Sequence, residues 1–419
     1  MFKNILTLIL FCCFQLNLKA QIPSYINDNE VYQDYIQAVQ FGVGDLTLSL
    51  PVIDLESQGK LNLEFDDTEG GYKPFLYRIV HCDKDWKNSQ LEEIEYIYGF
   101  NDEEIEEFSY STNAYSEYTH YQLSLPNDDL EWTISGNYIL YIYDDEIGVP
   151  ILSRRFVVAE NEVSIDIGVI QPKSVAKRKS HHELIVKVNY GGFVINSPNQ
   201  EIFLYIMQNG NWNSAKSNIK HTYDRGDILF YDQFDYITFP ALKGYRQFDT
   251  RTLKSRSEFV YAIDQNDYET NVLLDLGKRH YVYFRNDPDA NGGFVLSNND
   301  FLDADVSSEY VNVIFTLECD SLPHDVYITG ALSGYRPSDK FKMEYDSERQ
   351  IYHKMVSLKQ GYYDYMYAML TPEGLLDISY VEGDWFETEN DYLAIIYYRS
   401  IAGEYDRVLG VRNINSYPR

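Results

Sequence analysis

The chain of 419 residues has few cysteines. Four occur, and Cys12 and Cys13 fall within the first twenty residues, which leaves Cys82 and Cys319. Two cysteines that far apart in sequence cannot form the multi-bridge framework of small secreted domains. The sequence favours two free thiols that pack as small hydrophobic groups, and it leaves open a bridge between Cys82 and Cys319.

Long hydrophobic runs are lacking beyond the N-terminus. The chain starts with "MFKNILTLILFCCFQLNLKAQ", in which Lys3 precedes an apolar run at 5–14, and Leu18 and Ala20 precede Gln21 at the −3 and −1 positions. This pattern predicts a secretory signal peptide at residues 1–20, because the run is too short to span a bilayer. A lipoprotein signal is the alternative, but it would need a small residue at position 11, which is Phe.

Basic residues are scarce relative to acidic ones. The chain has 35 Lys and Arg against 65 Asp and Glu, a net charge of −30. Removal of residues 1–20 takes away Lys3 and Lys19, leaving 33 basic residues and a net charge of −32. Such a charge disfavours nucleic acid and anionic membrane surfaces as partners. We therefore expect an exported, soluble protein without direct membrane insertion.

Strong catalytic signatures are also missing from the sequence. There is no glycine-rich phosphate loop, no G-x-S-x-G elbow and no H-E-x-x-H pair. These motifs carry phosphate binding, nucleophilic catalysis and zinc-dependent hydrolysis respectively. Their absence favours a binding or structural protein without a cofactor over an enzyme.

Tyrosine is abundant, with 39 residues, and aromatic residues make up 16% of the chain. In "ELIVKVNY" (183–190), apolar residues alternate with polar ones, which indicates a half-buried strand. Similar runs are "GNYILYIY" (136–143), "EIFLYIMQ" (201–208), "RHYVYFRN" (279–286), "VNVIFTL" (311–317) and "YYDYMYAML" (362–370). "NGN" at 209–211 predicts a hairpin turn. The fold class is predicted as all-β, with tandem immunoglobulin- or fibronectin-like sandwiches.

A mature chain near 400 residues is longer than the chain that a single hydrophobic core usually supports. We expect three units: an N-terminal sandwich at 21–160, a central β-rich unit at 161–304 and a C-terminal sandwich at 305–419. The stretch "VYITGALSGYRPSDKFKMEYD" (326–346) resembles the start of a glycogen-type carbohydrate-binding sandwich. That resemblance implies Tyr335 and Trp385 as a candidate sugar platform.

The segment "HCDKDW" concentrates His81, Cys82, Asp83, Asp85 and Trp86 in six positions. The preceding "FLYRIV" is strand-like, so neighbouring His and Cys side chains project to opposite faces. Neighbours on a strand cannot readily bind one metal ion or form a contacting Cys–His catalytic pair. We predict a structural segment, in which the tryptophan packs over the core and the aspartates shape a turn.

Tyr138 follows "SGN" at the start of a predicted strand. This placement is typical of the tyrosine corner of immunoglobulin-like sandwiches, where the hydroxyl bonds to the preceding backbone. It supports a fibronectin-like first unit.

Two acidic segments are candidate sites. "DPDANG" (287–292) offers Asp287, Asp289 and Asn291 as calcium ligands, but position twelve is Asn298 instead of the bidentate Glu. A hairpin turn between strands explains the same residues. "EGDWFETEND" (382–391) carries carboxylates that could serve glycoside hydrolysis, whereas a solvated or partner-facing loop is the simpler expectation in so acidic a chain.

The order of motifs along the chain resembles the type IX secretion system plug protein family of Bacteroidota. "LYRIVHCDKDW", "LEEIEYIYGF", "YSTNAYSEYTHYQLSLPN", "SGNYILYIYD" and "ILSRRFVVAE" are similar to its N-terminal domain. "TFPALKGYRQFDTRTL", "NDPDANGGFVL", "YVNVIFTL", "VYITGALSGY", "LKQGYYDYMY" and "ETENDYLAIIYYRSIAGEYDRVLG" are similar to the rest.

The resemblance implies a non-enzymatic periplasmic β-sandwich protein, held at the outer membrane by its partner. That partner is the giant outer-membrane β-barrel translocon, whose periplasmic mouth such a protein seals when no cargo is bound. The family supplies no catalytic residue and no residue for contact with the barrel. A periplasmic glycan-binding or adhesion module is the alternative function.

Overall fold

The computed structural model describes residues 27–44, 48–145, 148–257, 259–264, 269–272, 275–276 and 289–416. The predicted signal peptide lies outside the described residues, as does the predicted strand at 279–286.

The regular secondary structure of the described chain is almost entirely strand, arranged in several mostly antiparallel sheets, which confirms the predicted all-β class of tandem sandwiches. Helical segments in the described ranges are short: α1 (Glu93–Tyr96), α2 (Pro198–Glu201), α3 (Ala304–Ser307), α4 (Ile378–Glu382), and the 3-10 turns η1 (Val175–Lys177) and η3 (Ala331–Ser333). None of these helices is long and apolar enough to cross a membrane.

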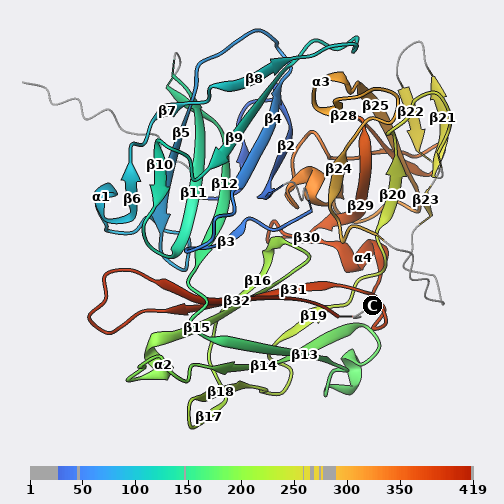
Figure 1. The fold of residues 1–419 in the computed structure, drawn as a ribbon. Helices are drawn as coiled ribbons and strands as arrows, with labels where there is room; N and C mark the ends of the chain where they lie inside the picture. Colours follow the sequence, from blue (N-terminus) through green and yellow to red (C-terminus); the bar gives the residue numbers. More distant parts are fainter. Residues whose placement is uncertain are drawn as a thin grey trace, which may run out of the picture.

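The first unit is a sandwich of two sheets with a two-strand ribbon (Figure 1). One sheet has the order β1 (Glu30–Val31), β12 (Val149–Ala159), β11 (Gly136–Asp144), β5 (Phe75–Cys82) and β7 (Glu103–Glu104), with β3 (Val52–Asp54) parallel to β12. The other has the order β2 (Ile36–Val43), β4 (Leu61–Asp67), β9 (Thr119–Leu125) and β8 (Glu107–Tyr110). The ribbon pairs β10 (Leu130–Trp132) with β6 (Ile97–Gly99).

Alternation along β4 shows why these residues form a half-buried strand. Leu61, Leu63 and Phe65 are fully buried in the core between the two sheets. Glu64 and Asp66 lie between these positions and therefore point to the other face. That outer face is covered by the third unit, so Asp66 is buried as well.

The central unit contains two sheets around a core of its own. One has the order β13 (Ser164–Ile170), β14 (His181–Asn189), β18 (Ile228–Tyr231) and β17 (Tyr223–Arg225), with β19 (Thr238–Pro240) also on β14. The other has the order β16 (Asn211–Ile219), β15 (Ile202–Gln208), β31 (Asp391–Tyr398) and β32 (Arg407–Asn415). Asn209 and Gly210 connect β15 to β16 with positive φ angles, which confirms the predicted hairpin turn.

The third unit also contains two sheets around a core of its own. One centres on β29 (Gly361–Leu370), which pairs with β20 (Arg246–Asp249), β24 (Phe294–Leu296), β26 (Val326–Thr329) and β30 (Leu376–Asp377). The other contains β21 (Val260–Asp264), β22 (Glu269–Val272), β23 (Asp275–Leu276), β25 (Tyr310–Glu318), β28 (Ile351–Lys359) and β27 (Glu344–Asp346).

The strand pairing departs in two places from the expected partition at 160 and 304. Strands β20 to β24 precede residue 304, but they pair within the sheets of the third unit. Strands β31 and β32, at the far end of the chain, complete a sheet of the central unit. The cause is long-range pairing: β31 bonds to β15, almost two hundred residues earlier, and no local pattern encodes that choice.

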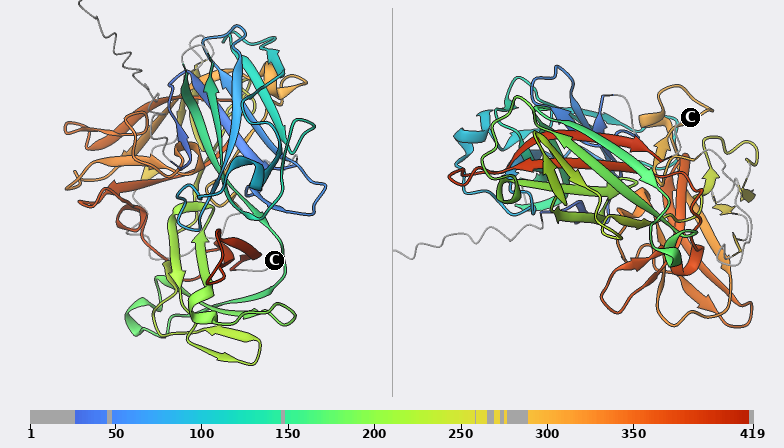
Figure 2. Two further views of the ribbon diagram at one scale, coloured as in Figure 1. Left: turned by 90° about the vertical axis from the view of Figure 1, so that its left-hand side faces the viewer. Right: turned by 90° about the horizontal axis from the view of Figure 1, so that it is seen from below.

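The first and third units lie side by side, and the central unit lies across one end of both (Figures 1 and 2). Polar contacts join them. Asp66 of β4 accepts hydrogen bonds from Tyr310 (2.6 Å) and Lys359 (2.7 Å) of the third unit. Asn291 of the third unit donates to Asp391 of β31 at 2.8 Å. Every pair of units is thus in direct contact, since the first and central units share an apolar cluster.

Candidate functional site

The HCDKDW segment (residues 81–86) ends strand β5 and forms the turn that follows. His81 lies inside the first sandwich, against the rings of Tyr96 and Tyr138. Cys82 lies on the other face of the sheet, in the apolar cluster shared with the central unit. The two side chains therefore do not share a site, as expected for consecutive strand residues.

Burial also keeps both groups in their uncharged forms. It lowers the pKa of His81 to about 4 and raises the pKa of Cys82 to about 12. At neutral pH the imidazole is neutral and the thiol is protonated, so neither a general acid nor a thiolate is available. The structure records Cys82 and Cys319 as free thiols.

His81 gives the free energy of unfolding a pH dependence that can be measured. Its pKa is about 4 when folded, against roughly 6.5 when unfolded. The unfolded chain therefore binds more protons between these values, so this stabilisation is complete above roughly pH 6.5 and is lost as the pH falls. We expect His81 to contribute a loss of about 3 kcal/mol by pH 4, measured by chemical denaturation from pH 4 to 7.

The control is the variant His81→Gln, which has no imidazole to titrate. Comparison with the variant is needed because burial raises the pKa of Asp364 to about 7, which gives the opposite slope over this range. The wild type should lose more stability on acidification than the variant. Equal pH dependence of the two proteins would contradict the assignment.

The two aspartates of the segment have different partners. Asp83 accepts hydrogen bonds from the backbone N–H groups of Asp85 and Lys87, both at 2.9 Å, and so fixes the turn. Asp85 reaches the central unit, where it accepts from the hydroxyl of Tyr205 and from Asn218 at 3.1 Å. Asp83 therefore closes the turn, and Asp85 joins the first unit to the central one.

Trp86 occupies the centre of this junction. Its side chain is buried, its ring meets that of Trp212 edge to face at 4.9 Å, and the guanidinium of Arg155 lies 4.5 Å above it. The surrounding cluster contains Cys82, Ile139, Tyr141 and Val157 of the first unit and Tyr205, Met207, Leu393, Ile395, Tyr397 and Val408 of the central unit. The tryptophan therefore packs between two units.

Tyr138 is fully buried, and its hydroxyl donates to the carbonyl of Ile134 at 2.8 Å. The bond ties the start of β11 to the loop before it, which is the geometry of a tyrosine corner. Sequence position and structure agree on this interaction.

The candidate calcium loop is described only in part, because Asp287 lies outside the described residues. Asp289 accepts from the backbone N–H groups of Tyr245 and Asn291, both at 3.1 Å. The amide of Asn291 donates to Asp391 at 2.8 Å. In the part that is described, these side chains bind the protein itself and link the third unit to the central one.

The acidic segment 382–391 differs from the expected solvated loop. Glu382 is fully buried and forms two hydrogen bonds with Arg246, at 2.9 and 3.0 Å. Asp384 accepts from the backbone N–H of Leu242 at 2.9 Å. These carboxylates hold the fold, because β20 and the segment before it bring the Arg246 side chain and the backbone N–H of Leu242 to them.

The proposed sugar platform is turned inward. The hydroxyl of Tyr335 donates to the carbonyl of Asn209 in the central unit at 3.2 Å. Trp385 is half-buried, with its backbone N–H bonded to Leu242 at 2.8 Å. The two aromatic residues therefore do not present a shared exposed face.

A hollow of about 560 Å³ lies beside the HCDKDW segment. Its wall includes Asn27, Arg78, Val80, Trp86, Tyr141 and Tyr143. The guanidinium of Arg78 is held by Asp102, with Nε at 2.7 Å from the carboxylate. The charge of Arg78 on this wall is therefore already compensated within the fold.

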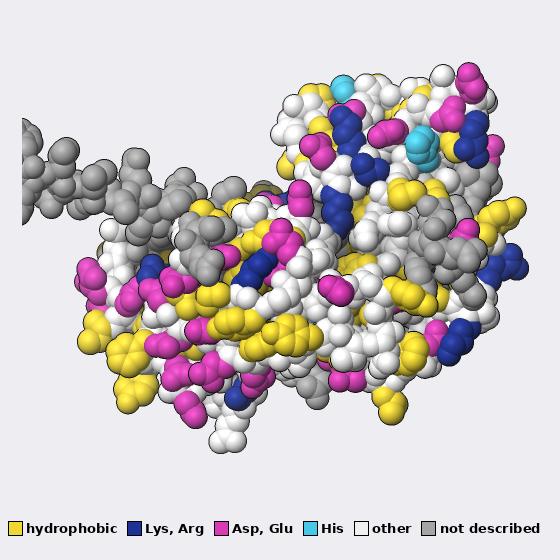
Figure 3. All heavy atoms as spheres, turned by 90° about the horizontal axis from the view of Figure 1, so that it is seen from above, with side chains coloured by type: hydrophobic (Ala, Val, Ile, Leu, Met, Phe, Trp, Pro, Cys, Tyr) yellow, Lys and Arg dark blue, Asp and Glu magenta, His cyan; other side chains and the backbone are white. Residues whose placement is uncertain are grey.

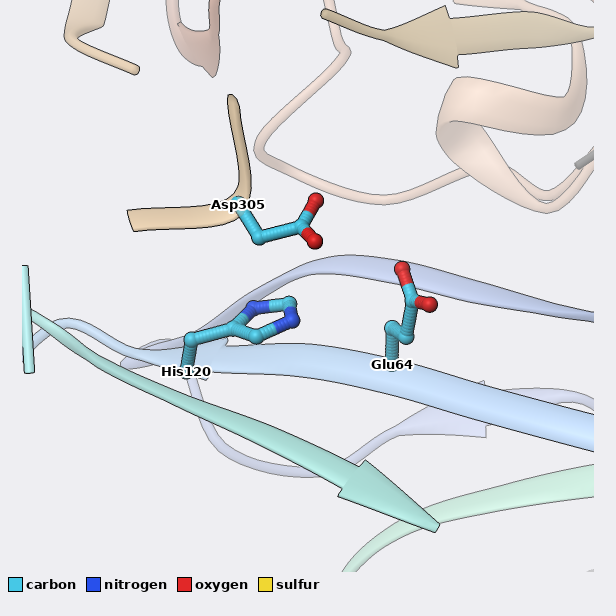
Figure 4. A group of neighbouring side chains, drawn as sticks. All are labelled: Glu64, His120 and Asp305. Carbon is cyan, nitrogen blue, oxygen red and sulfur yellow. The ribbon is translucent and has the colours of Figure 1, made fainter. Parts of the chain in front are cut away.

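Sequence reasoning missed one cluster of potential metal ligands, formed by Glu64, His120 and Asp305 (Figure 4). Strands β4 and β9 are neighbours. Asp66, two residues after Glu64 on β4, lies opposite His120 on β9, which places Glu64 close to His120. Asp305 comes from α3 of the third unit. The three ligands are separated by 56 and 185 positions in the chain. A local motif could not reveal them, because their proximity depends on how the units pack.

Comparison with known proteins gives one family match. Residues 36–160 match the family model described as "Type 9 secretion system plug protein 1st domain". A crystal structure of a hypothetical protein from Parabacteroides merdae is similar at a TM-score of 0.89 and 30% identity, over 93% of this chain and 99% of that one.

Two further structures are C-terminal domains of antigen I/II-family proteins from Streptococcus pyogenes and Streptococcus agalactiae. Their TM-scores are 0.16 and 0.15 at 8% identity, over 91% and 90% of this chain and 99% and 98% of theirs. Likeness at that level carries no argument. No curated protein matches the chain.

Proposed function

The chain belongs to the type IX secretion system plug protein family, and we propose that it seals the periplasmic opening of the giant outer-membrane β-barrel translocon when no cargo is bound. The match of residues 36–160 to the first domain of that family carries the proposal. The family is a component of a secretion system and is not a known enzyme family. We accordingly place the protein in the periplasm and give it no catalytic role.

Rigid coupling of the three units supports a sealing role. A plug that resists solvent flow must not come apart at its internal junctions. The Trp86 cluster joins the first unit to the central one, and Asp66 with Lys359 joins the first to the third. Arg336 of the third unit also forms ion pairs with Asp28 and Glu30 of the first.

An exposed aromatic patch supplies a candidate contact with the barrel. The β8 patch consists of Tyr72, Phe108 and Tyr110, in which Phe108 lies 5.0 Å from the ring of Tyr72 and 5.7 Å from that of Tyr110. The side chains are 36–54% exposed; Phe108 and Tyr110 lie on the edge strand β8, and Tyr72 lies in the loop before β5. Figure 3 views the end of the molecule where β8 lies and shows hydrophobic side chains interspersed with acidic ones. Aromatic groups of this kind anchor protein interfaces.

Affinity purification from the native envelope tests the proposal. A tagged full-length chain is expected to recover a very large outer-membrane barrel from detergent-solubilised membranes. Recovery should fall when cargo is trapped in the channel. Isolation of the chain alone, or with polysaccharide-utilisation proteins, would contradict the proposal and favour the glycan-binding alternative.

The β8 patch gives a sharper version of this experiment. Phe108→Ala with Tyr110→Ala is expected to weaken the complex about 30-fold or more, because truncation of an interface aromatic costs roughly 2 kcal/mol. The readout is the recovery of barrel at increasing detergent-extract dilution.

The matched control is Phe234→Ala with Tyr236→Ala, which removes two aromatic groups that are 63% and 42% exposed on the central unit. The control should recover the barrel normally. Unfolding midpoints of both double variants establish that neither has lost its fold. Equal recovery by both would exclude the β8 patch as the contact, while leaving the plug function to the first experiment.

A further inference from the structure

A histidine and two carboxylates meet where the first unit packs against the third. Glu64 on β4 and His120 on β9 lie on the outer face of one sheet, and Asp305 on α3 approaches from the third unit (Figure 4). One ligand atom from each residue lies within 4.8 Å of the other two. His120 is buried, and the two carboxylates are half-buried.

The imidazole of His120 is oriented by Asp66. Nδ1 lies 2.7 Å from the Asp66 carboxylate, which also accepts from Tyr310 and Lys359. A proton on Nδ1 donated to this carboxylate leaves the lone pair on Nε2. A carboxylate that holds the second nitrogen of a histidine in this way is the usual outer partner of a metal-binding imidazole.

The other nitrogen, Nε2, is the observation that points to a ligand. It is buried and has no hydrogen-bond partner, in a side chain only 5% exposed. Figure 4 shows it turned toward Glu64, beneath the carboxylate of Asp305. An unpaired buried acceptor is costly, and a cation held between it and the carboxylates would satisfy it.

The charges of the cluster fit a divalent ion. Glu64, Asp66 and Asp305 carry three negative charges and Lys359 one positive charge, while the histidine is neutral in this tautomer. One divalent cation would balance the remaining two negative charges.

We propose that Glu64, His120 and Asp305 bind one Zn²⁺ ion, which joins the first unit to the third. One nitrogen and two carboxylate oxygens suit zinc, with water as the fourth ligand, whereas Ca²⁺ and Mg²⁺ select oxygen ligands alone. Bonds of about 2.0–2.2 Å place tetrahedral ligand atoms roughly 3.3 Å apart, so the two flexible carboxylate side chains close slightly around the ion. This site does not depend on the proposed plug function.

The test is titration of the full mature chain with ZnCl₂ by isothermal calorimetry in metal-free buffer. One equivalent is expected to bind, with competition from Co²⁺, whose bound form should show the visible absorption of a tetrahedral site. Millimolar Ca²⁺ or Mg²⁺ should leave the binding unchanged. Zn²⁺ should also raise the unfolding midpoint, because an ion that binds only the folded state stabilises it.

Two variants and a control make the result specific. His120→Ala and the double variant Glu64→Gln with Asp305→Asn should each weaken binding at least 100-fold. The carboxamide variant keeps the shape of the side chains, so it remains informative if His120→Ala fails to fold. His324→Ala, which removes an exposed histidine, should bind as the wild type does. The absence of saturable binding, or equal binding by the carboxamide variant, would overturn the proposal.

Discussion

Replacement of Trp86 by alanine is expected to lower the free energy of unfolding by about 3–5 kcal/mol, the usual cost of truncating a buried tryptophan. The ring is 8% exposed and is enclosed by Trp212 and Arg155 at the junction of the first and central units. Its loss leaves a cavity between two units instead of inside one. We therefore expect the first unit to unfold separately in chemical denaturation, with two transitions in place of one.

A double-mutant cycle with Trp212→Ala measures the coupling across the junction. If the two rings stabilise each other, the double variant should lose less than the sum of the two single losses. Tyr98→Ala serves as the control, because that side chain is 74% exposed and its truncation should change stability by less than roughly 0.5 kcal/mol. A loss in Trp86→Ala no larger than in the control would contradict the assigned role.

Replacement of Arg246 by methionine is expected to lower the free energy of unfolding by about 3–5 kcal/mol, because it leaves a buried carboxylate without its cation. Glu382 is fully buried, and its carboxylate accepts two bonds from Arg246 and one from the backbone N–H of Tyr367 at 2.9 Å. The guanidinium also lies 5.1 Å from the ring of Tyr367. Chemical denaturation at pH 7 measures the loss.

The double variant Arg246→Met with Glu382→Leu distinguishes an unpaired charge from lost packing. Removal of both charges should be less destabilising than removal of the arginine alone, since no buried ion is left behind. If the single and double variants lose the same stability, packing of the long side chains would explain the effect instead.

The pairing of Arg246 with Glu382 is a feature that the sequence does not predict. The segment 382–391 looked like a solvated acidic loop because acidic residues are abundant throughout the chain. Burial of its first residue depends on α4 packing beside β20 and β29. Charge density along a sequence does not indicate which carboxylate will meet a buried arginine.

The HCDKDW segment illustrates a partial success. Alternation along a strand predicts that His81 and Cys82 lie on opposite faces, and the position of the aspartates after the strand predicts a turn. The sequence does not predict the partner of Trp86, because Trp212 belongs to another unit. Local periodicity specifies the face on which a side chain lies, whereas the surface that covers it is chosen by tertiary packing.

By itself, the sequence determined the all-β class, the strands at 136–143 and 183–190, the hairpin at 209–211 and the Tyr138 corner, because each depends on period-two alternation or on a bond within a few residues. Only the tertiary structure decided that β31 and β32 complete the central unit and that Glu64, His120 and Asp305 meet. These features join segments that are far apart in the chain, and the free energy that selects them comes from burial and pairing between units instead of from local preference.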